Sequence, residues 1–163
     1  MEALLIPLGI IVFIIFNAIF TVKQQTFKSI ERFGKFVRIA DPGINIKIPF
    51  IEKASRPQSM RIRQLDVPVE TKTEDNVFVS VSISVQYRIL EGKQFDAFYR
   101  LDNAERQITA YVFDVVRARV PKLSLDDLFE KKDEIADAVK EELDEIMGQF
   151  GYGIVKALVT DLD

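Results

Sequence analysis

Residues 77–89 read VFVSVSISVQYRI, and this stretch decides the fold class. Apolar or aromatic side chains occupy every second position from Val77 to Ile89, and serine, Gln86 or Arg88 occupies most positions between them. A strict period of two predicts a β-strand, here longer than the usual length of about 5–6 residues. Because one of its faces is polar, we expect the strand to lie in an antiparallel sheet whose second face is open to water.

Shorter strands and turns are expected on the N-terminal side of this strand. Two more alternating stretches predict half-buried strands: Leu65, Val67 and Val69 within residues 61–70, and Ile44, Ile46 and Ile48 before Pro49. Residues 31–35, ERFGK, predict a hairpin with Gly34 in its turn, and the Pro42-Gly43 pair predicts a further turn. The first half of the body is therefore expected to be rich in β-strands.

The hydrophobic period changes on the C-terminal side. Residues 102–105, DNAE, have the form of a capping box, and apolar residues follow at helical spacing until Pro121. Residues 124–127, SLDD, form a second such box and predict a longer helix to about Gly148, with a buried stripe of Leu128, Ile135, Val139, Leu143, Ile146 and Met147. Residues 154–162 predict a final strand. Strands followed by two helices and a strand indicate an α+β fold.

Residues 3–22, ALLIPLGIIVFIIFNAIFTV, contain no charge. A helix of this length spans about 30 Å, the thickness of the bilayer's hydrocarbon core. The missing basic n-region and cleavage site disfavour a signal peptide, and the missing polar stripe disfavours a soluble core helix. We therefore expect residues 1–22 to be a membrane anchor, single-pass or, because of Pro7 and Gly9, a re-entrant hairpin. Its anchoring side chains are expected to be Leu4, Leu5, Ile6, Ile10, Ile11, Val12, Phe13, Ile14, Ile15, Phe16, Ile19 and Phe20.

Basic and aromatic residues follow the apolar run, and no Lys or Arg precedes it. The positive-inside rule therefore places the body on the cytoplasmic side of the membrane. Cations interleaved with phenylalanines are typical of a surface that rests on anionic head groups. Two interpretations of Phe50 stay open: it dips into the leaflet within residues 48–51, or it caps the core of its domain. The expected membrane-interface residues are Lys23, Lys28, Arg32, Phe33, Lys35, Phe36, Lys47, Pro49, Phe50, Ile51 and Lys53.

The residue types argue against catalysis. The chain has no Cys and no His, which excludes disulfides, Cys or His metal sites and a Ser-His-Asp triad. The acidic pairs at 126–127 and 141–142 indicate a solvated helix face, and Ser80, Ser82 and Ser84 share the polar face of the predicted strand. There is no glycine-rich phosphate loop, and a net charge of −3 disfavours nucleic-acid binding. We expect no enzymatic activity and no cofactor, metal or nucleic-acid partner.

Four segments resemble one protein superfamily: ERFGKFVRIADPGINIKIPF (31–50), RQLDVPVETKTEDNVFVSVSISVQYRI (63–89), AYVFDVVRARVPKLSLDDLFEKKDEI (110–135) and YGIVKALVTDL (152–162). They resemble the stomatin/prohibitin/flotillin/HflK-C (SPFH, or band 7) superfamily, and most of all its stomatin branch and the plant hypersensitive-induced-reaction proteins. Residues 116–127 match the family's V-R-A-x-V-P-x-L-x-L-D-D stretch between helices. The matches to the family's membrane-proximal motif are Pro42, Gly43, Pro49 and Phe50.

The resemblance implies a two-part SPFH domain behind the anchor, with a β-rich membrane-proximal part at residues 23–90 and an α/β part at residues 91–163. It implies no catalytic residue. It also implies homo-oligomers that form membrane-bound rings or cages, organise membrane microdomains, and enclose or regulate membrane proteins. The coiled coil that follows this domain in the family is absent from the chain, so we expect it to have been truncated or omitted.

The function expected from these observations is that of a non-enzymatic membrane scaffold. One alternative is a regulatory subunit of a single membrane protease or channel, with an FtsH- or NfeD-type partner. A second alternative is a hydrolase that uses a Ser-Lys pair. The residues expected to contact neighbouring subunits are Val77, Val79, Val81, Ile83, Asp126 and Asp127.

Overall fold

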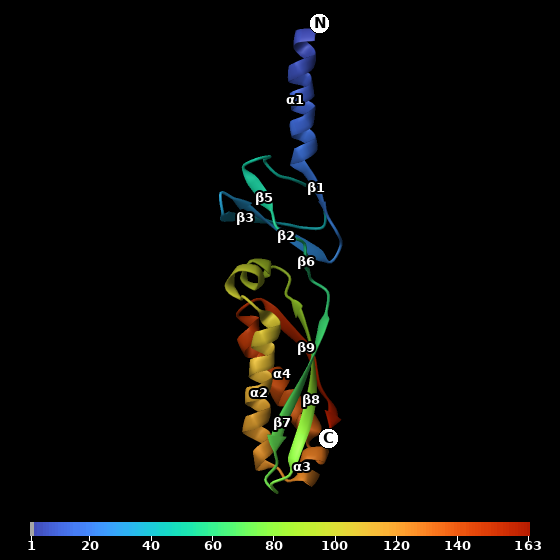
Figure 1. Cartoon of the computed structure of the whole chain (residues 1–163), viewed down its shortest axis with the longest axis vertical. Coiled ribbons are helices and arrows are strands. Elements are labelled where there is room, and N and C mark those ends of the chain that lie inside the picture. Colours follow the sequence, from blue (N-terminus) through green and yellow to red (C-terminus); the bar gives the residue numbers. More distant parts are fainter. Residues whose placement is uncertain (1) are drawn as a thin grey trace. The chain divides into compact units, whose positions relative to one another are not determined.

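The computed structural model describes the backbone of residues 2–163 and the side chains of residues 5–163. They form two compact units: an N-terminal unit that ends at Arg61 and a C-terminal unit, Ile62–Asp163. Figure 1 labels the helices and strands of both. Leu4, which we expected in the anchor, lies outside the residues whose side chains are described.

The N-terminal unit combines one helix with two small sheets. Its elements are α1 (Glu2–Ala18), β1 (Ile19–Val22), β2 (Thr26–Arg32), β3 (Lys35–Ala40), β4 (Gly43–Ile46), β5 (Glu52–Ala54) and β6 (Gln58–Ser59). Strands β1 and β4 form an antiparallel ribbon, while β2 lies between β3 and β5 and also pairs with β6. The predicted hairpin is confirmed, because β2 and β3 are joined at Phe33 and Gly34. Its small core contains Val22, Ile30 and Ala40.

The helix α1 is shorter than the sequence predicted. Residues 19–22 do not continue it but form β1, whose backbone pairs with β4 from Ile19 opposite Ile46 to Val22 opposite Gly43. The backbone N–H of Lys47 donates to the carbonyl of Ala18 at 2.8 Å, which satisfies one of the free carbonyls at the helix end. None of the helices within residues 2–163 is both long and apolar enough to cross a membrane.

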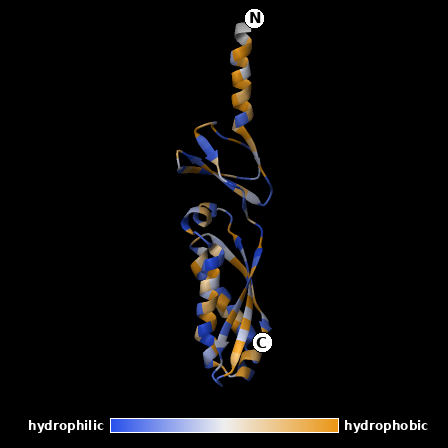
Figure 2. Ribbon diagram, in the orientation of Figure 1, coloured by the Kyte–Doolittle hydropathy of each residue, from blue (hydrophilic) through white to orange (hydrophobic). Residues whose placement is uncertain are grey.

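The C-terminal unit packs helices on one face of a three-stranded sheet. Its elements are β7 (Arg63–Lys72), β8 (Phe78–Ile89), a π-helix η1 (Asp96–Arg100), α2 (Ala104–Arg119), a 3₁₀ turn η2 (Val120–Lys122), α3 (Leu125–Glu130), α4 (Lys132–Gly148) and β9 (Tyr152–Leu162). The sheet is antiparallel throughout, with β8 between β7 and β9. The predicted α+β fold class is confirmed, and Figure 2 shows hydrophobic and hydrophilic residues alternating along these helices.

The predicted central strand is confirmed as β8. Its alternate side chains, among them Val81, Ile83 and Val85, are buried in one core with residues of α2 and α4. The second face of β8 is not uniformly wet. Ser84 is 3% exposed, and its hydroxyl donates a hydrogen bond to the Asp66 carboxylate on β7.

Helices begin where the two capping boxes predicted them, but the first cap lies one residue later than expected and the second helix is interrupted. The cap of α2 is Asn103, whose side chain accepts from the Arg106 N–H at 3.0 Å. Ser124 caps α3 by accepting from the Asp127 N–H at 3.1 Å. The predicted long helix is divided at Lys131 into α3 and α4. Its predicted stripe is buried except at Ile146, which is partly buried.

The boundary between the units differs from the one expected between residues 90 and 91. Strands β7 and β8 share a core with α2 and α4, so the second compact unit already begins at Ile62. Three residues expected to contact neighbouring subunits, Val79, Val81 and Ile83, belong to this core and are at most 7% exposed. They are therefore not available on the surface of the folded chain.

The start of β9 makes a close backbone contact within the C-terminal unit. The Leu90 N–H donates to the Gly151 carbonyl at 2.8 Å. Gly151 has φ +82°, and a Cβ at this position would lie 2.5 Å from the Lys93 carbonyl oxygen. Only glycine fits both the conformation and the space.

Candidate membrane-facing site

The side chains of α1 are exposed on every side of the helix. Leu5, Ile6 and Phe16 are each more than 60% exposed, and the other large apolar side chains described from Leu8 to Ile15 are more than 40% exposed. Figure 2 shows the helix as hydrophobic along its length. An apolar helix without a polar stripe is typical of burial in a protein core or a membrane.

The β1–β4 ribbon extends this apolar surface at the foot of α1. Ile19 lies opposite Ile46, and Thr21 lies opposite Ile44, so these side chains share one face of the ribbon. Ile44 and Ile46 are 78% and 67% exposed, against the sequence-based prediction of a half-buried strand with its isoleucines inward. The reason is that β4 pairs only with β1, and Val22 enters the small core from the opposite face. We call Ile19, Ile44 and Ile46 the apolar ribbon face.

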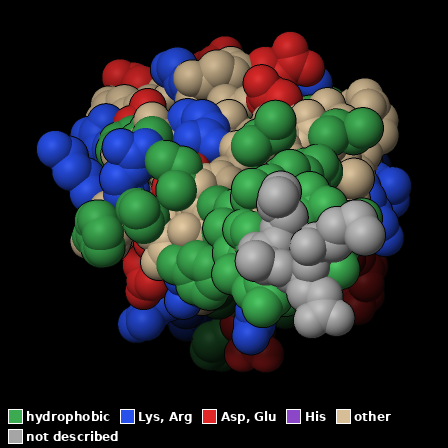
Figure 3. Space-filling model, turned by 90° about the horizontal axis from the view of Figure 1, so that it is seen from above, with side chains coloured by type: hydrophobic (Ala, Val, Ile, Leu, Met, Phe, Trp, Pro, Cys, Tyr) green, Lys and Arg blue, Asp and Glu red, His purple; other side chains and the backbone are tan. Residues whose placement is uncertain are grey.

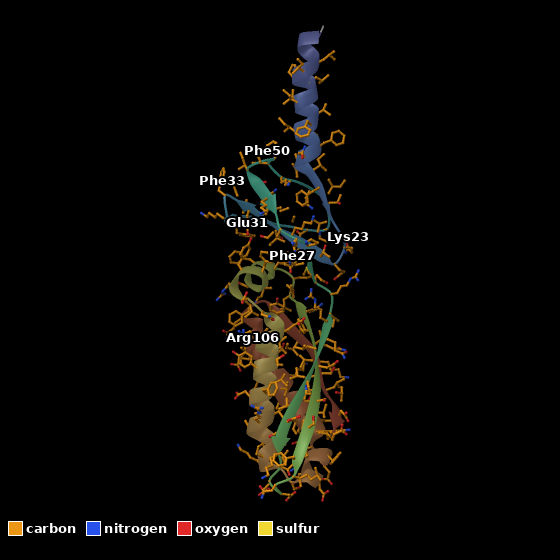
Figure 4. All side chains as sticks on the ribbon, viewed as in Figure 1. Lys23, Phe27, Glu31, Phe33, Phe50 and Arg106 are labelled. Atoms are coloured by element: carbon orange, nitrogen blue, oxygen red, sulfur yellow. The ribbon has the colours of Figure 1, made fainter. Side chains whose placement is uncertain are left out.

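Two phenylalanines of the same unit are also strongly exposed. Phe33 lies in the β2–β3 turn and is 84% exposed, and Phe50 lies in the loop between β4 and β5 and is 87% exposed. Arg32 and Glu52 are opposite each other on β2 and β5, which brings the two phenylalanines to the same end of these strands. Figure 4 shows both on the side of the unit from which α1 extends. We call Phe33 and Phe50 the aromatic tips. Their exposure excludes the interpretation that Phe50 caps the core.

Glu52 connects the segments that carry the aromatic tips. Its side chain is 1% exposed, and its carboxylate lies 2.8 Å from Arg32 Nη2 and 3.3 Å from Arg38 Nη1. It also accepts from the Ile48 N–H at 2.9 Å. The hydrogen bond from Ile48, and after it the one from Arg32, lowers the pKa of Glu52 to about 2. The carboxylate is therefore ionised at neutral pH. The sequence analysis missed this cluster, and its only local signal is a lone acidic residue among many cations.

The predicted interface cations do not all lie with the aromatic tips. Lys35 and Lys53 are exposed and follow the Phe33-Gly34 turn and Glu52 directly. Lys23 follows Val22, at the end of the ribbon away from Ile19 and α1 (Figure 4). Lys28 is partly buried, with its Nζ 5.5 Å from the centroid of the Phe20 ring. In the view of Figure 3, hydrophobic side chains gather around the end of α1.

The other predicted interface residues are divided between exposed and partly buried positions. Arg32 and Ile51 are exposed, whereas Phe36, Lys47 and Pro49 are partly buried. Arg32 forms the ion pair with Glu52 described above. Its charge is therefore largely compensated within the chain.

The predicted oligomer contacts that remain at the surface lie at one end of the C-terminal unit. Val77 is 39% exposed and Asp126 is exposed. Their segments meet, because the Leu125 N–H donates to the Asp75 carboxylate at 2.9 Å. Asp127 has a local structural role: the hydrogen bond from the Ser124 hydroxyl, with Lys131 nearby, lowers its pKa. Among the described residues, no group of three His, Cys, Asp or Glu side chains forms a metal site.

A model of the SPFH domain / Band 7 family matches residues 20–163. The chain belongs to this family. The sequence-based recognition is thereby confirmed, and α1 up to Ala18 lies outside the matched residues. SPFH proteins are membrane-associated scaffolds that oligomerise.

Individual SPFH relatives come from plants, archaea and animals. Hypersensitive-induced response protein 4 of Arabidopsis thaliana is 47% identical over 142 residues, which are 86% of this chain and 49% of that protein. An uncharacterized protein of Methanocaldococcus jannaschii is 34% identical over 158 residues, 96% of this chain and 78% of that protein. Human stomatin-like protein 2, mitochondrial, is 27% identical over 142 residues, 86% of this chain and 39% of that protein. The chain thus spans about half the length of the plant relative.

Proposed function

We propose that this protein is a non-enzymatic membrane scaffold whose copies assemble into a ring or cage and organise the lipids and proteins around it. The observation that carries the proposal is the exposed apolar surface of the N-terminal unit, which includes α1, the apolar ribbon face and the aromatic tips. Exposed apolar surface of this extent marks interaction with a membrane or a partner. Membership in a family of membrane-associated scaffolds supports the membrane.

In this proposal α1, which is too short to cross the bilayer as a helix by itself, inserts into it as a re-entrant segment. Its 17 residues correspond to about 26 Å of helix, and the ribbon and tips then lie at the lipid head groups. The lysines beside the tips face anionic lipids, each contributing about 1 kcal/mol near the surface. We place the body on the cytoplasmic side, because the cations follow the apolar segment.

Flotation of the full chain with vesicles of phosphatidylcholine and phosphatidylserine tests the membrane step. We expect the chain to float with the vesicles, and Ile10→Asp with Ile14→Asp to abolish flotation. Both isoleucines are more than 40% exposed, so the substitutions should leave the fold intact. If the unaltered chain stays at the bottom of the gradient, the proposed membrane association is wrong.

Two further measurements test the assembly and the orientation. In mild detergent we expect a large homo-oligomeric particle, with Val77 and Asp126 near the contact between subunits. A small complex with a single protease or channel would instead favour a regulatory subunit. For orientation, the chain has no cysteine, so Glu91→Cys at an exposed turn introduces a single thiol. Its labelling by an impermeant maleimide in intact cells would refute the cytoplasmic orientation.

A further inference from the structure

Both aromatic tips have a backbone conformation that phenylalanine rarely adopts. The φ angles are 51° at Phe33 and 66° at Phe50. Bulky L-residues are strained in this left-handed region, and glycine or asparagine is the usual occupant of such turns. Packing within the chain does not offset the strain, because both side chains are more than 80% exposed. Strained residues of this kind persist where the surrounding structure holds them, and they occur preferentially at functional sites.

The surrounding structure here is the Glu52 cluster, which consists of Arg32, Arg38 and Glu52. The loop of residues 48–52 is closed at its base in both directions, because the Ile48 N–H donates to the Glu52 carboxylate and the Glu52 N–H donates to the Ile48 carbonyl, each at 2.9 Å. Phe50 is therefore held at the apex of a closed five-residue loop.

The same carboxylate also holds the second tip. Arg32 is the residue directly before Phe33, and it donates to Glu52 Oε1 at 2.8 Å across the β2–β5 pair. Arg38 lies on β3, the other strand of the hairpin, and donates both to Glu52 and to the Ile46 carbonyl at the end of β4. Glu52 thus connects the hairpin that carries Phe33 with the loop that carries Phe50, and Arg38 connects this cluster to the end of β4.

We propose that Glu52 is a positioning residue that presets Phe33 and Phe50 as a rigid pair of aromatic anchors for the interfacial zone of a lipid leaflet. This role rests on the membrane association proposed above and adds to it a defined contact beside α1. Rigid presentation lowers the entropy lost when the two side chains enter the leaflet.

The position and charge of the surroundings favour lipid as the occupant of this surface. Exposed lysines flank both tips, with Lys35 next to the Phe33-Gly34 turn and Lys53 opposite Glu31 on the paired strand. The loop that carries Phe50 also starts at the foot of α1, because it begins at Lys47, whose N–H donates to the Ala18 carbonyl. An apolar surface bordered by lysines suits anionic head groups above an acyl-chain boundary.

The chain contains no tryptophan, so a single substitution gives an unambiguous depth probe. We suggest four full-length variants: Phe33→Trp and Phe50→Trp for the tips, Phe13→Trp for α1, and Phe78→Trp as a control. Phe78 is 81% exposed, as the tips are, but lies on β8 in the C-terminal unit. Each variant is mixed with phosphatidylcholine/phosphatidylserine vesicles that carry brominated acyl chains, and quenching of its emission is measured.

We expect quenching of both tip probes and of the α1 probe, and none at Phe78→Trp. Adding Glu52→Gln should lower the quenching of the tip probes toward that of Phe78→Trp and leave the α1 probe unchanged. The double variant Phe33→Ser with Phe50→Ser should weaken vesicle partition about tenfold, which corresponds to 1.4 kcal/mol, while Phe78→Ser should not change it.

Three results separate the possible failures. If the α1 probe is not quenched, the membrane association itself is wrong. If the α1 probe is quenched but the tip probes are not, the tips face a protein partner or water, and the inference is overturned. If Glu52→Gln leaves the tip probes as deep as before, Glu52 does not position them. Should Glu52→Gln unfold the N-terminal unit, Arg38→Lys, which keeps the charge but loses the planar guanidinium, is measured in its place.

Discussion

Replacing Gly151 by alanine tests the tightest backbone contact that we describe in the C-terminal unit. A Cβ at this position would lie 2.5 Å from the Lys93 carbonyl oxygen and 3.2 Å from the Ala97 nitrogen, and both are backbone atoms that cannot turn away. Gly92 is the matched control, because its φ of +79° is close to the +82° of Gly151 and nothing lies within 4 Å of its added Cβ.

Both substitutions place an alanine in a left-handed conformation, but only Gly151→Ala also creates a steric clash. A left-handed conformation costs an alanine about 1 kcal/mol, and this applies to both positions. Forcing an extra methyl group into filled space costs about 1–3 kcal/mol more, and this applies only to Gly151. We therefore expect Gly92→Ala to lower the free energy of unfolding by about 1 kcal/mol, and Gly151→Ala to lower it by about 2–4 kcal/mol.

Urea denaturation followed by tyrosine emission measures this difference. The chain has four tyrosines and no tryptophan, and all four tyrosines lie in the C-terminal unit, so the signal reports on that unit alone. The slope of the transition should stay the same in both variants. If the two substitutions lower the free energy of unfolding by the same amount within about 0.5 kcal/mol, the close approach of Lys93 to Gly151 has no energetic effect, and the reasoning is refuted.

Three further predictions follow from burial, capping and titration. Leu143→Ala removes a fully buried side chain from α4 and should cost about 2–5 kcal/mol, clearly more than Ile146→Ala at the partly buried neighbouring position; the same tyrosine signal measures both. Asn103→Ala should cost about 1 kcal/mol, whereas Asp102→Ala should cost little because Asn103 is the cap; a larger loss for Asp102→Ala would contradict this assignment. The pKa of Glu52 lies below its ordinary value of 4.5, at about 2, so its stabilising effect should be complete above pH 4.5 and disappear as the pH falls through 2; hydrogen exchange of the N-terminal unit should show this loss, and Glu52→Gln should remove it.

The C-terminal unit was predictable because the hydrophobic pattern of each of its elements shows which face of that element is buried. The alternation along β8 and the stripe on α4 face each other in one core, so the hydrophobic period identifies the buried face directly. The helix starts were also predictable, since Asn103 and Ser124 act on N–H groups three residues away. The division at Lys131 carries no such local signal.

The N-terminal unit was less predictable, because pairing between distant segments decides it. Hydropathy continues unbroken through Ala18 into Ile19, and only the pairing of β1 with β4 turns the chain from helix to strand. The alternation of Ile44 and Ile46 predicts a strand but cannot show which of its faces is covered. The Glu52 cluster joins residues 14 and 20 positions apart, so no local pattern could have revealed it.

The direct junction between α1 and β1 has a mechanical consequence. A helix attached through a flexible linker can tilt in a bilayer without turning the domain that it carries. Here no linker intervenes, and the Lys47–Ala18 hydrogen bond together with the β1–β4 pairing joins the helix end to the ribbon on both sides. With this joint, and with α1 in the membrane as proposed above, any tilt of the helix turns the ribbon with it.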